Sequence, residues 1–439
     1  MVATDFFTRL CRTMILKQLT KLQDGFIDIQ DNGQHFLFGK AHSRLQGQIE
    51  IQSPAFWSAV ATQGSIGAGE SYIHGHWSSP DLTAIMRILI RNLDVLDGME
   101  SGLASLGRPG LRLLHWLNRN SRRGAKRNVT AHYDLGNDLF ETFLDPTLMY
   151  SSAMFLSPAD SLEQAQIRKM DRICQKLALG PHDHLLEIGT GWGSLAIYAA
   201  HQYGCRVTTT TLSPKQHQYA IQRVREAGLE GRITVLLKDY RDLAGSYDKL
   251  VSVEMIEAVG QKFLSDYFRQ CQQLLKAEGL MLLQAITIRE QRYHHTVNNV
   301  DFIQRYIFPG GSLPSIEKLI AISGTSTDMN VTHLEEFGVH YARTLHDWLQ
   351  RFKQATTSLR HRGYDSEFQR MWEFYLCYCE GGFLERAIGV VQILFARSAA
   401  RPAPLLAPLA TTSLLSTSDP DDIATCPSCS GSSIAAKSL

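Results

Sequence analysis

The sequence has almost no net charge and no long apolar run. Each of these features argues against a class of protein. Its 439 residues contain 44 Lys and Arg against 43 Asp and Glu, which gives a formal net charge of +1. A chain without excess positive charge offers no general electrostatic reason to bind nucleic acid. No apolar stretch approaches the roughly 20 residues that a membrane-spanning helix needs. The first residues also lack the basic start and apolar core of a secretory signal.

Cysteine is sparse and scattered. The eight cysteines form no spaced framework, which is expected of a protein in a reducing compartment such as the cytoplasm. One close pair, Cys426 and Cys429, has neither a second pair nor histidines near it in sequence, so we predict no metal site. This pair lies in residues 399–439, whose Pro, Ser, Ala and Thr content is typical of a disordered tail.

The most informative pattern that is present lies between residues 185 and 203. The mostly apolar stretch Leu185–Ile188 is followed by three glycines spaced two apart, Gly189, Gly191 and Gly193, and then by helix-forming residues. Glycine suits a sharp turn and a ligand that lies against bare main chain. The spacing differs from the G-x-G-x-x-G of dinucleotide sites. It therefore favours S-adenosylmethionine over NAD, with a strand-to-helix turn that holds no ligand as the alternative.

Strands and helices alternate after this turn. Further strands are predicted over residues 205–212, 232–239, 247–253 and 279–288, and Ser213 and Pro214 open a helix between the first two. Such alternation is typical of an α/β protein with a parallel sheet covered on both faces. Ligands of these sheets bind beyond the carboxyl ends of the strands, where the glycine turn, Leu212 and Asp239 fall.

The chain divides into four stretches. Residues 1–105 mix short alternating runs with helical segments, which predicts a small α+β domain. Residues 106–127 are basic and amphipathic, with seven Lys or Arg and Trp116. A solvated linker is the simpler interpretation of this segment, and contact with anionic lipid headgroups is the alternative. Residues 128–398 form the catalytic body, and residues 399–439 form the tail.

Several sequence segments rich in polar and aromatic residues indicate one family. They are residues 131–140 and 144–155, 253–260, and then 302–315, 340–348 and 372–386. Together they resemble the cyclopropane-fatty-acyl-phospholipid synthase family, which includes the mycolic acid cyclopropane synthases. The resemblance covers about residues 60–397. The string Gly67–Trp77 is similar to one in the bacterial members that act on phospholipids, and the shorter mycolic members lack that domain.

This resemblance implies a class I S-adenosylmethionine methyltransferase fold, with a Rossmann-like, mostly parallel seven-stranded sheet and helices on both faces. It implies transfer of the methyl group to the double bond of an unsaturated phospholipid acyl chain, followed by proton loss and closure of a cyclopropane ring. An alkene is a weak nucleophile, so the site must align it with the methyl group and keep water from the carbocation. Aromatic rings can stabilise such a cation; the candidates are Tyr133, Tyr306, Phe308, Tyr341 and Trp348.

The family uses a bound bicarbonate ion as the proton acceptor. The matching pocket residues in this sequence are Ser152, Glu257, Gln284 and Tyr341. Gln284, and Ala258 beside Glu257, stand where histidines are usual in well-known members. A glutamine can hydrogen-bond an anion but cannot become a cation or relay a proton. Cyclopropanation is therefore favoured, and methylation without ring closure, to a methyl-branched or methylated-olefin product, is its rival.

The resemblance also implies the residues that bind S-adenosylmethionine. Tyr150 and Ser151 would contact its methionine end, and the three glycines would form the turn. The segment beside ribose and adenine would contain Thr211, Leu212, Gln216, Asp239 and Tyr240. Cys379 matches a cysteine that the family implies to be catalytic, although a Cys on an aromatic helix is usually a packing residue.

Relatives further imply a homodimer and peripheral contact with the inner face of the membrane. Two other classes of function compete with a lipid methyltransferase. A methyltransferase for a soluble small molecule is disfavoured because the resemblance extends into the strings after residue 300. A non-catalytic lipid-binding module is disfavoured because the glycine turn and Glu257 are intact.

Overall fold

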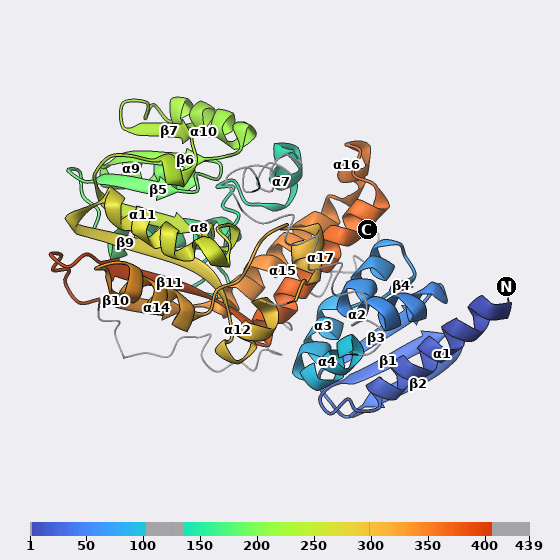
Figure 1. Cartoon of the computed structure of the whole chain (residues 1–439). Coiled ribbons are helices and arrows are strands. Elements are labelled where there is room, and N and C mark those ends of the chain that lie inside the picture. Colours follow the sequence, from blue (N-terminus) through green and yellow to red (C-terminus); the bar gives the residue numbers. More distant parts are fainter. Residues whose placement is uncertain (1, 102–123, 125–135, 298, 406–439) are drawn as a thin grey trace.

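The structure, a computed structural model, describes residues 2–101, 124, 136–297 and 299–405 (Figure 1). The basic segment 106–127, apart from Gly124, lies outside the described residues. So do Tyr133 and the part of the tail that holds Cys426 and Cys429. Within the described parts, no helix has the length and apolar content needed to cross a bilayer.

The N-terminal part is built on a four-stranded sheet with the order β2-β1-β3-β4. Strand β1 pairs antiparallel with β2 and parallel with β3. The isoleucines of β1 alternate with polar residues, and Ile27 and Ile29 are buried against the helices. The elements are α1 (Val2–Leu19), β1 (Phe26–Asp31), β2 (Gln34–Gly39), β3 (Gln46–Ile51), α2 (Ala55–Ile73), β4 (Trp77–Ser78), α3 (Leu82–Arg91) and α4 (Leu93–Ser101).

The larger part is built on a seven-stranded sheet with the order β10-β11-β9-β8-β5-β6-β7. Neighbouring strands from β9 to β7 are parallel, whereas β11 is antiparallel to both β9 and β10. This confirms the predicted α/β class and its mostly parallel sheet. The strands are β5 (His184–Ile188), β6 (Arg206–Thr211), β7 (Ile233–Leu237), β8 (Tyr247–Val253), β9 (Leu275–Ile288), β10 (Asn330–Glu336) and β11 (Ile388–Ala396).

Helices precede, connect and follow these strands. Helix α8 begins with a capping box in which Ser161 and Gln164 satisfy each other's backbone amides, and Ser213 caps α10 with Pro214 in its first turn, as predicted. The helices are α7 (Asn137–Phe143), α8 (Leu162–Lys176), α9 (Ser194–Tyr203), α10 (Pro214–Glu226), α11 (Leu264–Leu274), α12 (Glu290–Val297), α13 (Phe302–Tyr306), α14 (Ile316–Ser326), α15 (Gly338–Gln354), α16 (Thr356–His361) and α17 (Ser366–Leu384).

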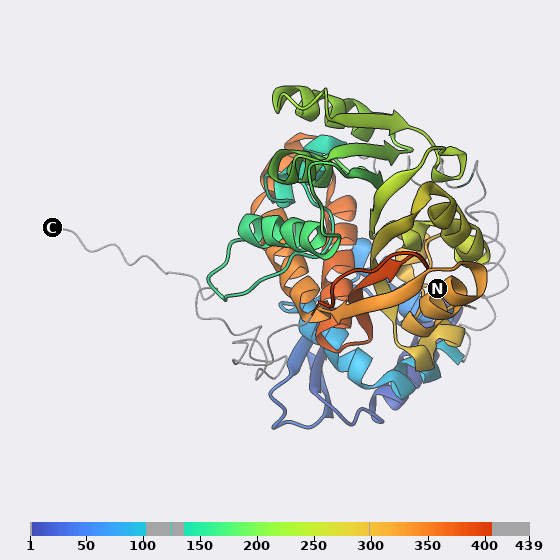
Figure 2. The ribbon, with the colours of Figure 1, turned by 90° about the vertical axis from the view of Figure 1, so that its left-hand side faces the viewer.

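The two faces of the large sheet carry separate cores. Leu185 and Leu282 pack with α8 and α9, whereas their neighbours Leu186 and Leu283 pack with α11 and α14. Successive side chains of a strand point to opposite faces, so strands that are buried on both faces read as continuous apolar runs. Figure 2 shows the green helix α8 and the yellow helix α11 on opposite sides of the sheet.

The N-terminal part packs against α17, which lies between it and the large sheet (Figure 1). Gly381 of α17 allows close contact, because a Cβ at this position would stand 2.9 Å from the side chain of Met86. The carboxylate of Glu385 lies 2.7 Å from both Arg87 and Arg91 of α3. One continuous hydrophobic core therefore extends from α1 to α15 and α17.

Candidate active site

The glycine turn joins β5 to α9 and keeps all three glycines at positive φ. Their φ values are 106° at Gly189, 53° at Gly191 and 90° at Gly193, a region that side chains disfavour. The turn is held to β6 because the amides of Gly189 and Thr190 both donate to the carbonyl of Thr210, at 3.1 and 3.0 Å. A Cβ added to Gly191 would meet nothing within 4 Å. The open space on this side of the turn fits the methyl donor that the sequence implies.

The predicted cofactor segments lie at the carboxyl ends of β5, β6 and β7. The hydroxyl of Thr211 donates to the side-chain oxygen of buried Gln216 at 2.8 Å, so these two side chains fix each other, and Leu212 beside them is half-buried. Asp239 follows β7 and forms a 2.6 Å ion pair with Arg241, and Tyr240 is buried against Tyr267. The topology thus gathers these residues at one edge of the sheet, as expected.

Tyr150 and Ser151 lie in the segment of the chain between α7 and α8. The hydroxyls of Tyr150 and Tyr375 are 2.9 Å apart. The hydroxyl of Ser151 accepts a 2.6 Å bond from Lys169, whose side chain is fully buried in α8. Burial lowers the pKa of Lys169 to about 8, although the nearby carboxylates of Glu254 and Asp145 oppose the shift. Sequence reasoning misses Lys169, but a lysine on the apolar face of an amphipathic helix is a usable signal.

The centre of the site is Glu254, which the sequence analysis did not single out. It directly follows β8, and its carboxylate accepts three hydrogen bonds. These come from the Ser152 amide at 3.1 Å, the Gln284 side chain at 2.7 Å and the Tyr341 hydroxyl at 2.6 Å. Burial raises the pKa of Glu254, while the Tyr341 bond and the charge of Lys169 oppose the rise.

Three of the four predicted bicarbonate-pocket residues therefore meet on this carboxylate. Ser152 takes part through its backbone amide, because its hydroxyl donates to the carbonyl of Ala153. The signal available in the sequence is a second acid three residues before Glu257, at the carboxyl end of a predicted strand. The donors come from three distant segments, so this signal alone could not show what the acid binds.

Glu257, the fourth predicted residue, lies in the 3₁₀ turn η3 (Ile256–Ala258). One of its oxygens accepts a 2.5 Å bond from the amide of Ile286. The other oxygen is buried and has no hydrogen-bond partner among the described residues. Burial raises the pKa of Glu257 to about 8, and the neighbouring Glu254 adds to the rise. Burial therefore favours the protonated form of Glu257 at neutral pH.

A buried polar chain fixes the orientation of Gln284. Lys176 donates to the Gln392 oxygen at 2.8 Å, and Gln392 donates to the Gln284 oxygen at 2.9 Å. Because an ammonium group can only donate, the direction of each amide follows from Lys176. The amide nitrogen of Gln284 must then point to Glu254. A neutral glutamine is sufficient in this position because its side chain has to donate only one hydrogen bond to Glu254.

A large apolar cavity ends at these two carboxylates. Its volume is about 440 Å³, and it is bordered by Glu254, Glu257 and Tyr341 at one end. From there it passes Phe308 and α17 into the N-terminal part. Its lining there is aliphatic and aromatic, and includes Ile15, Leu19, Ile27, Ile29, Ile49 and Phe56. A volume of this size is typical of a small-molecule site, and the composition suits a long apolar ligand.

The other predicted site residues occupy different positions. Cys379 borders the cavity, but burial raises the pKa of its thiol, so it is not poised as a thiolate. Of the four described aromatic candidates, Phe308 and Tyr341 border the cavity. Trp348 instead packs against Tyr150 at 5.2 Å, and the hydroxyl of Tyr306 donates to Glu70.

Comparisons with known proteins identify the family of this chain. The family model for mycolic acid cyclopropane synthetase matches residues 120–393. The tuberculostearic acid methyltransferase UfaA1 of Mycobacterium tuberculosis is 42% identical over 81% of this chain and 84% of its own length. The cyclopropane-fatty-acyl-phospholipid synthase of Escherichia coli is 38% identical over 80% of this chain and 87% of its own length.

Solved structures give the same result for the catalytic part. The cyclopropane synthase MmaA2 from Mycobacterium tuberculosis is 32% identical, with a TM-score of 0.58, and covers 62% of this chain and 98% of its own. The mycolic acid cyclopropane synthase CmaA1, in complex with SAH and CTAB, matches to the same extent. The chain belongs to the mycolic acid cyclopropane synthetase family and is an S-adenosylmethionine-dependent methyltransferase.

Proposed function

We propose that this enzyme transfers a one-carbon unit from S-adenosylmethionine to the double bond of an unsaturated phospholipid acyl chain and closes a cyclopropane ring. The observation that carries this proposal is the cavity. It is long, apolar and continuous from the N-terminal part to the Glu254 and Glu257 carboxylates. A soluble small molecule would not need an apolar wall built by two separate sheets, whereas an acyl chain would.

The residues of the site position the substrate, exclude water and place a carboxylate near the reacting atoms. When bound, S-adenosylmethionine supplies an electrophilic methyl group on a sulfonium. The cavity wall holds the alkene in line with that methyl group and excludes water from the cation that forms. Phe308 and Tyr341 present aromatic rings to the cavity, and Glu254 places a carboxylate at its polar end.

Methylation without ring closure is a second candidate, and one observation favours it. UfaA1, a relative of this chain, is named a tuberculostearic acid methyltransferase. The first step, attack of the double bond on the methyl group, is the same for both products. They differ in what the cation does before a proton leaves, and Glu254 can accept that proton in either case.

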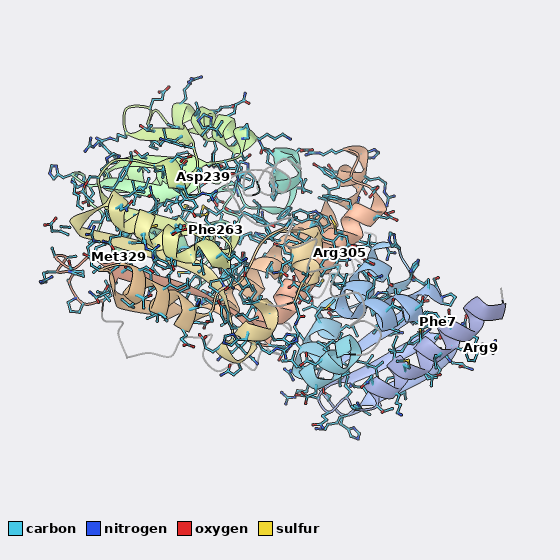
Figure 3. The ribbon with its side chains drawn as sticks, viewed as in Figure 1. Phe7, Arg9, Asp239, Phe263, Arg305 and Met329 are labelled. Carbon is cyan, nitrogen blue, oxygen red and sulfur yellow. The ribbon has the colours of Figure 1, made fainter. Side chains whose placement is uncertain are left out.

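We also propose that α1 contacts the membrane surface. Phe6, Phe7, Leu10 and Met14 are exposed by 72%, 41%, 47% and 39% on one side of this helix. Another side of the same helix supplies Ile15 and Leu19 to the cavity wall. In Figure 3, Phe7 and Arg9 lie on α1, at the end of the N-terminal part far from the large sheet. An exposed apolar face next to the cavity would give an acyl chain a way in from the bilayer. The homodimer and the lipid contact of residues 106–127 stay predictions.

Lipid analysis tests the reaction. Purified enzyme, S-adenosylmethionine and vesicles of an unsaturated phosphatidylethanolamine should yield acyl chains heavier by one methylene, measured by mass spectrometry. Upfield ring protons in the NMR spectrum would identify a cyclopropane, whereas olefinic methylene or methyl signals would identify the second candidate. Unchanged acyl chains with folded enzyme that binds S-adenosylmethionine would contradict both.

Vesicle sedimentation tests the proposed membrane contact. The double variant Phe6→Ser and Phe7→Ser should weaken binding to the same vesicles by about tenfold or more, since each Phe contributes about 1.5–3 kcal/mol when buried. Leu156→Ser is the matched control, because Leu156 is 69% exposed far from α1 in the sequence and outside the cavity wall. Equal effects of the two changes would contradict a specific role of α1.

A further inference from the structure

The pocket that the family resemblance assigns to bicarbonate already contains a carboxylate of this chain. The Ser152 amide, the Gln284 side chain and the Tyr341 hydroxyl all donate to Glu254, at 3.1, 2.7 and 2.6 Å. These are the groups that would have to hold the ion. With its donors engaged and its space filled by the Glu254 side chain, a bicarbonate ion does not fit among the residues present.

We propose that Glu254 itself is the proton acceptor of the reaction, so that turnover needs no bicarbonate. This inference rests on the proposed function, because it concerns the proton that leaves after the acyl chain has been methylated. It makes Glu254 a catalytic residue, with Tyr341, Gln284 and the Ser152 amide as the groups that position its carboxylate.

The backbone of Glu254 is strained. Its φ is 49°, a left-handed conformation that a residue with a Cβ disfavours and that glycine adopts freely. The backbone amide of Glu254 also donates to the carbonyl of Gln284 at 2.8 Å. Strained residues of this kind concentrate where the surrounding structure requires one particular side chain.

Hydrogen bonds and a nearby positive charge favour the ionised form of the Glu254 carboxylate and oppose the effect of burial. Its oxygens border the cavity, yet all three groups that contact them are hydrogen-bond donors. Buried Lys169 supplies a nearby positive charge, and the chain from Lys176 through Gln392 forces Gln284 to donate. No bound ion is needed to complete this arrangement, because each donor already has a partner.

With Glu254 as the proton acceptor, every bond and proton of the reaction is accounted for. The π electrons of the acyl double bond form the new bond to the methyl carbon, and sulfur keeps the electron pair of the broken bond. For ring closure, a C–H electron pair of the added methyl group then forms the third ring bond to the cationic carbon. The released proton binds a carboxylate oxygen of Glu254. A carbocation is such a strong acid that a well-placed, hydrogen-bonded carboxylate suffices as the base.

The native enzyme provides the first test. Formation of S-adenosylhomocysteine and of modified acyl chains is measured on unsaturated phosphatidylethanolamine vesicles, in buffer freed of carbon dioxide and in buffer with added bicarbonate. We expect the same rate in both. A rate that falls when bicarbonate is removed and recovers on its addition would overturn the proposal while supporting the proposed function. Folded enzyme that forms no product in either buffer would contradict the proposed function itself, and this inference with it.

Glu254→Gly provides the second test, because glycine fits the left-handed backbone and opens the anion pocket. Without bicarbonate we expect the rate to fall by about 100-fold or more. Added bicarbonate, or formate as a second small carboxylate, should restore activity in a saturable manner by binding among the freed donors. Calorimetry should show unchanged binding of S-adenosylmethionine. A variant that keeps the native rate without bicarbonate would overturn the proposal.

Glu278→Gly is the matched control, since Glu278 is an exposed acid near the start of β9. It should lose no activity and show no response to bicarbonate. If Glu254→Gly does not fold, the bicarbonate dependence of the native enzyme still decides the question.

Discussion

The two ends of the cavity are built in opposite ways. At the polar end, directed hydrogen bonds fix the groups: Tyr341, Gln284 and Ser152 donate to Glu254, and the Ile286 amide donates to Glu257. At the other end, the wall is an aliphatic and aromatic surface drawn from α1, β1, β3 and α2. Chemistry requires a single arrangement of groups, whereas holding an acyl chain requires only enough apolar surface. Substitutions at the polar end should therefore reduce kcat, and those at the apolar end should mainly change KM.

The largest expected effect separates the two carboxylates. Glu254→Gln should reduce kcat by about 100- to 10,000-fold, because the amide keeps the shape but cannot accept the proton. Glu257→Gln should reduce kcat by less than about tenfold below pH 8, because an amide resembles the protonated acid that burial favours. Steady-state kinetics at pH 7, with calorimetry of S-adenosylmethionine binding, measures both. Equal losses would contradict the different roles proposed for the two residues.

The protonation of Glu257 also makes stability depend on pH. Its pKa in the folded protein is about 8, against an ordinary 4.5, so the folded state binds more protons than the unfolded state between these values. The contribution of Glu257 to the free energy of unfolding is then complete below about pH 4.5 and is lost as the pH rises through about 8. The loss is at most about 1.4 kcal/mol per pH unit. Glu257→Gln should flatten this loss, by about 1–3 kcal/mol. Urea unfolding of both proteins at pH 5.5 and pH 8.5 measures it, and parallel curves would contradict it.

Tyr341→Phe should have an intermediate effect. It removes one of the three bonds to Glu254 and leaves the ring in place against Phe383, 4.5 Å away. A hydrogen bond to a charged group contributes about 1.5–3 kcal/mol, so kcat should fall by about 10- to 100-fold. Because Tyr341 acts through Glu254, the same change in Glu254→Gln protein should cost much less. Additive losses in this double-mutant cycle would show that Tyr341 acts independently.

The smallest effect is expected at the apolar end. Ile49→Val removes one methylene from the cavity wall, which is worth about 0.8 kcal/mol. KM should rise by no more than about fourfold, with kcat unchanged, because many other side chains still contact the acyl chain. A fall in kcat comparable to that of Tyr341→Phe would show that the wall also positions the double bond.

The same contrast explains what the sequence could predict. Strands β5 to β9 follow from apolar runs between turn residues, and the glycine turn marks the edge of the sheet where ligands bind. Strand β11 is a short, mostly apolar run that periodicity alone cannot distinguish from a buried helix. The cavity could not be predicted, because its wall joins residues of α1 and β3 to residues of α17.

Most residues of the candidate site could be predicted from the sequence, but the central residue, Glu254, could not. Ser152, Gln284 and Tyr341 could be named from the resemblance, yet their shared partner is an acid that only the folded chain brings within reach of all three. Lys169 was missed for the same reason, since its role depends on a serine 18 positions earlier and on the charge of Glu254. Burial and hydrogen bonding, which decide both roles, are properties of the folded chain.

Isotope labelling gives the most direct test of the proposed reaction. Enzyme is incubated with S-adenosylmethionine that carries a fully deuterated methyl group and with an unsaturated phospholipid, and the acyl chains are analysed by mass spectrometry. We expect each modified chain to gain one carbon and to keep two of the three deuterium atoms, because a base removes the third. Chains that gain no label, or that keep all three deuterium atoms, would contradict methylation of the double bond followed by proton loss from the added carbon.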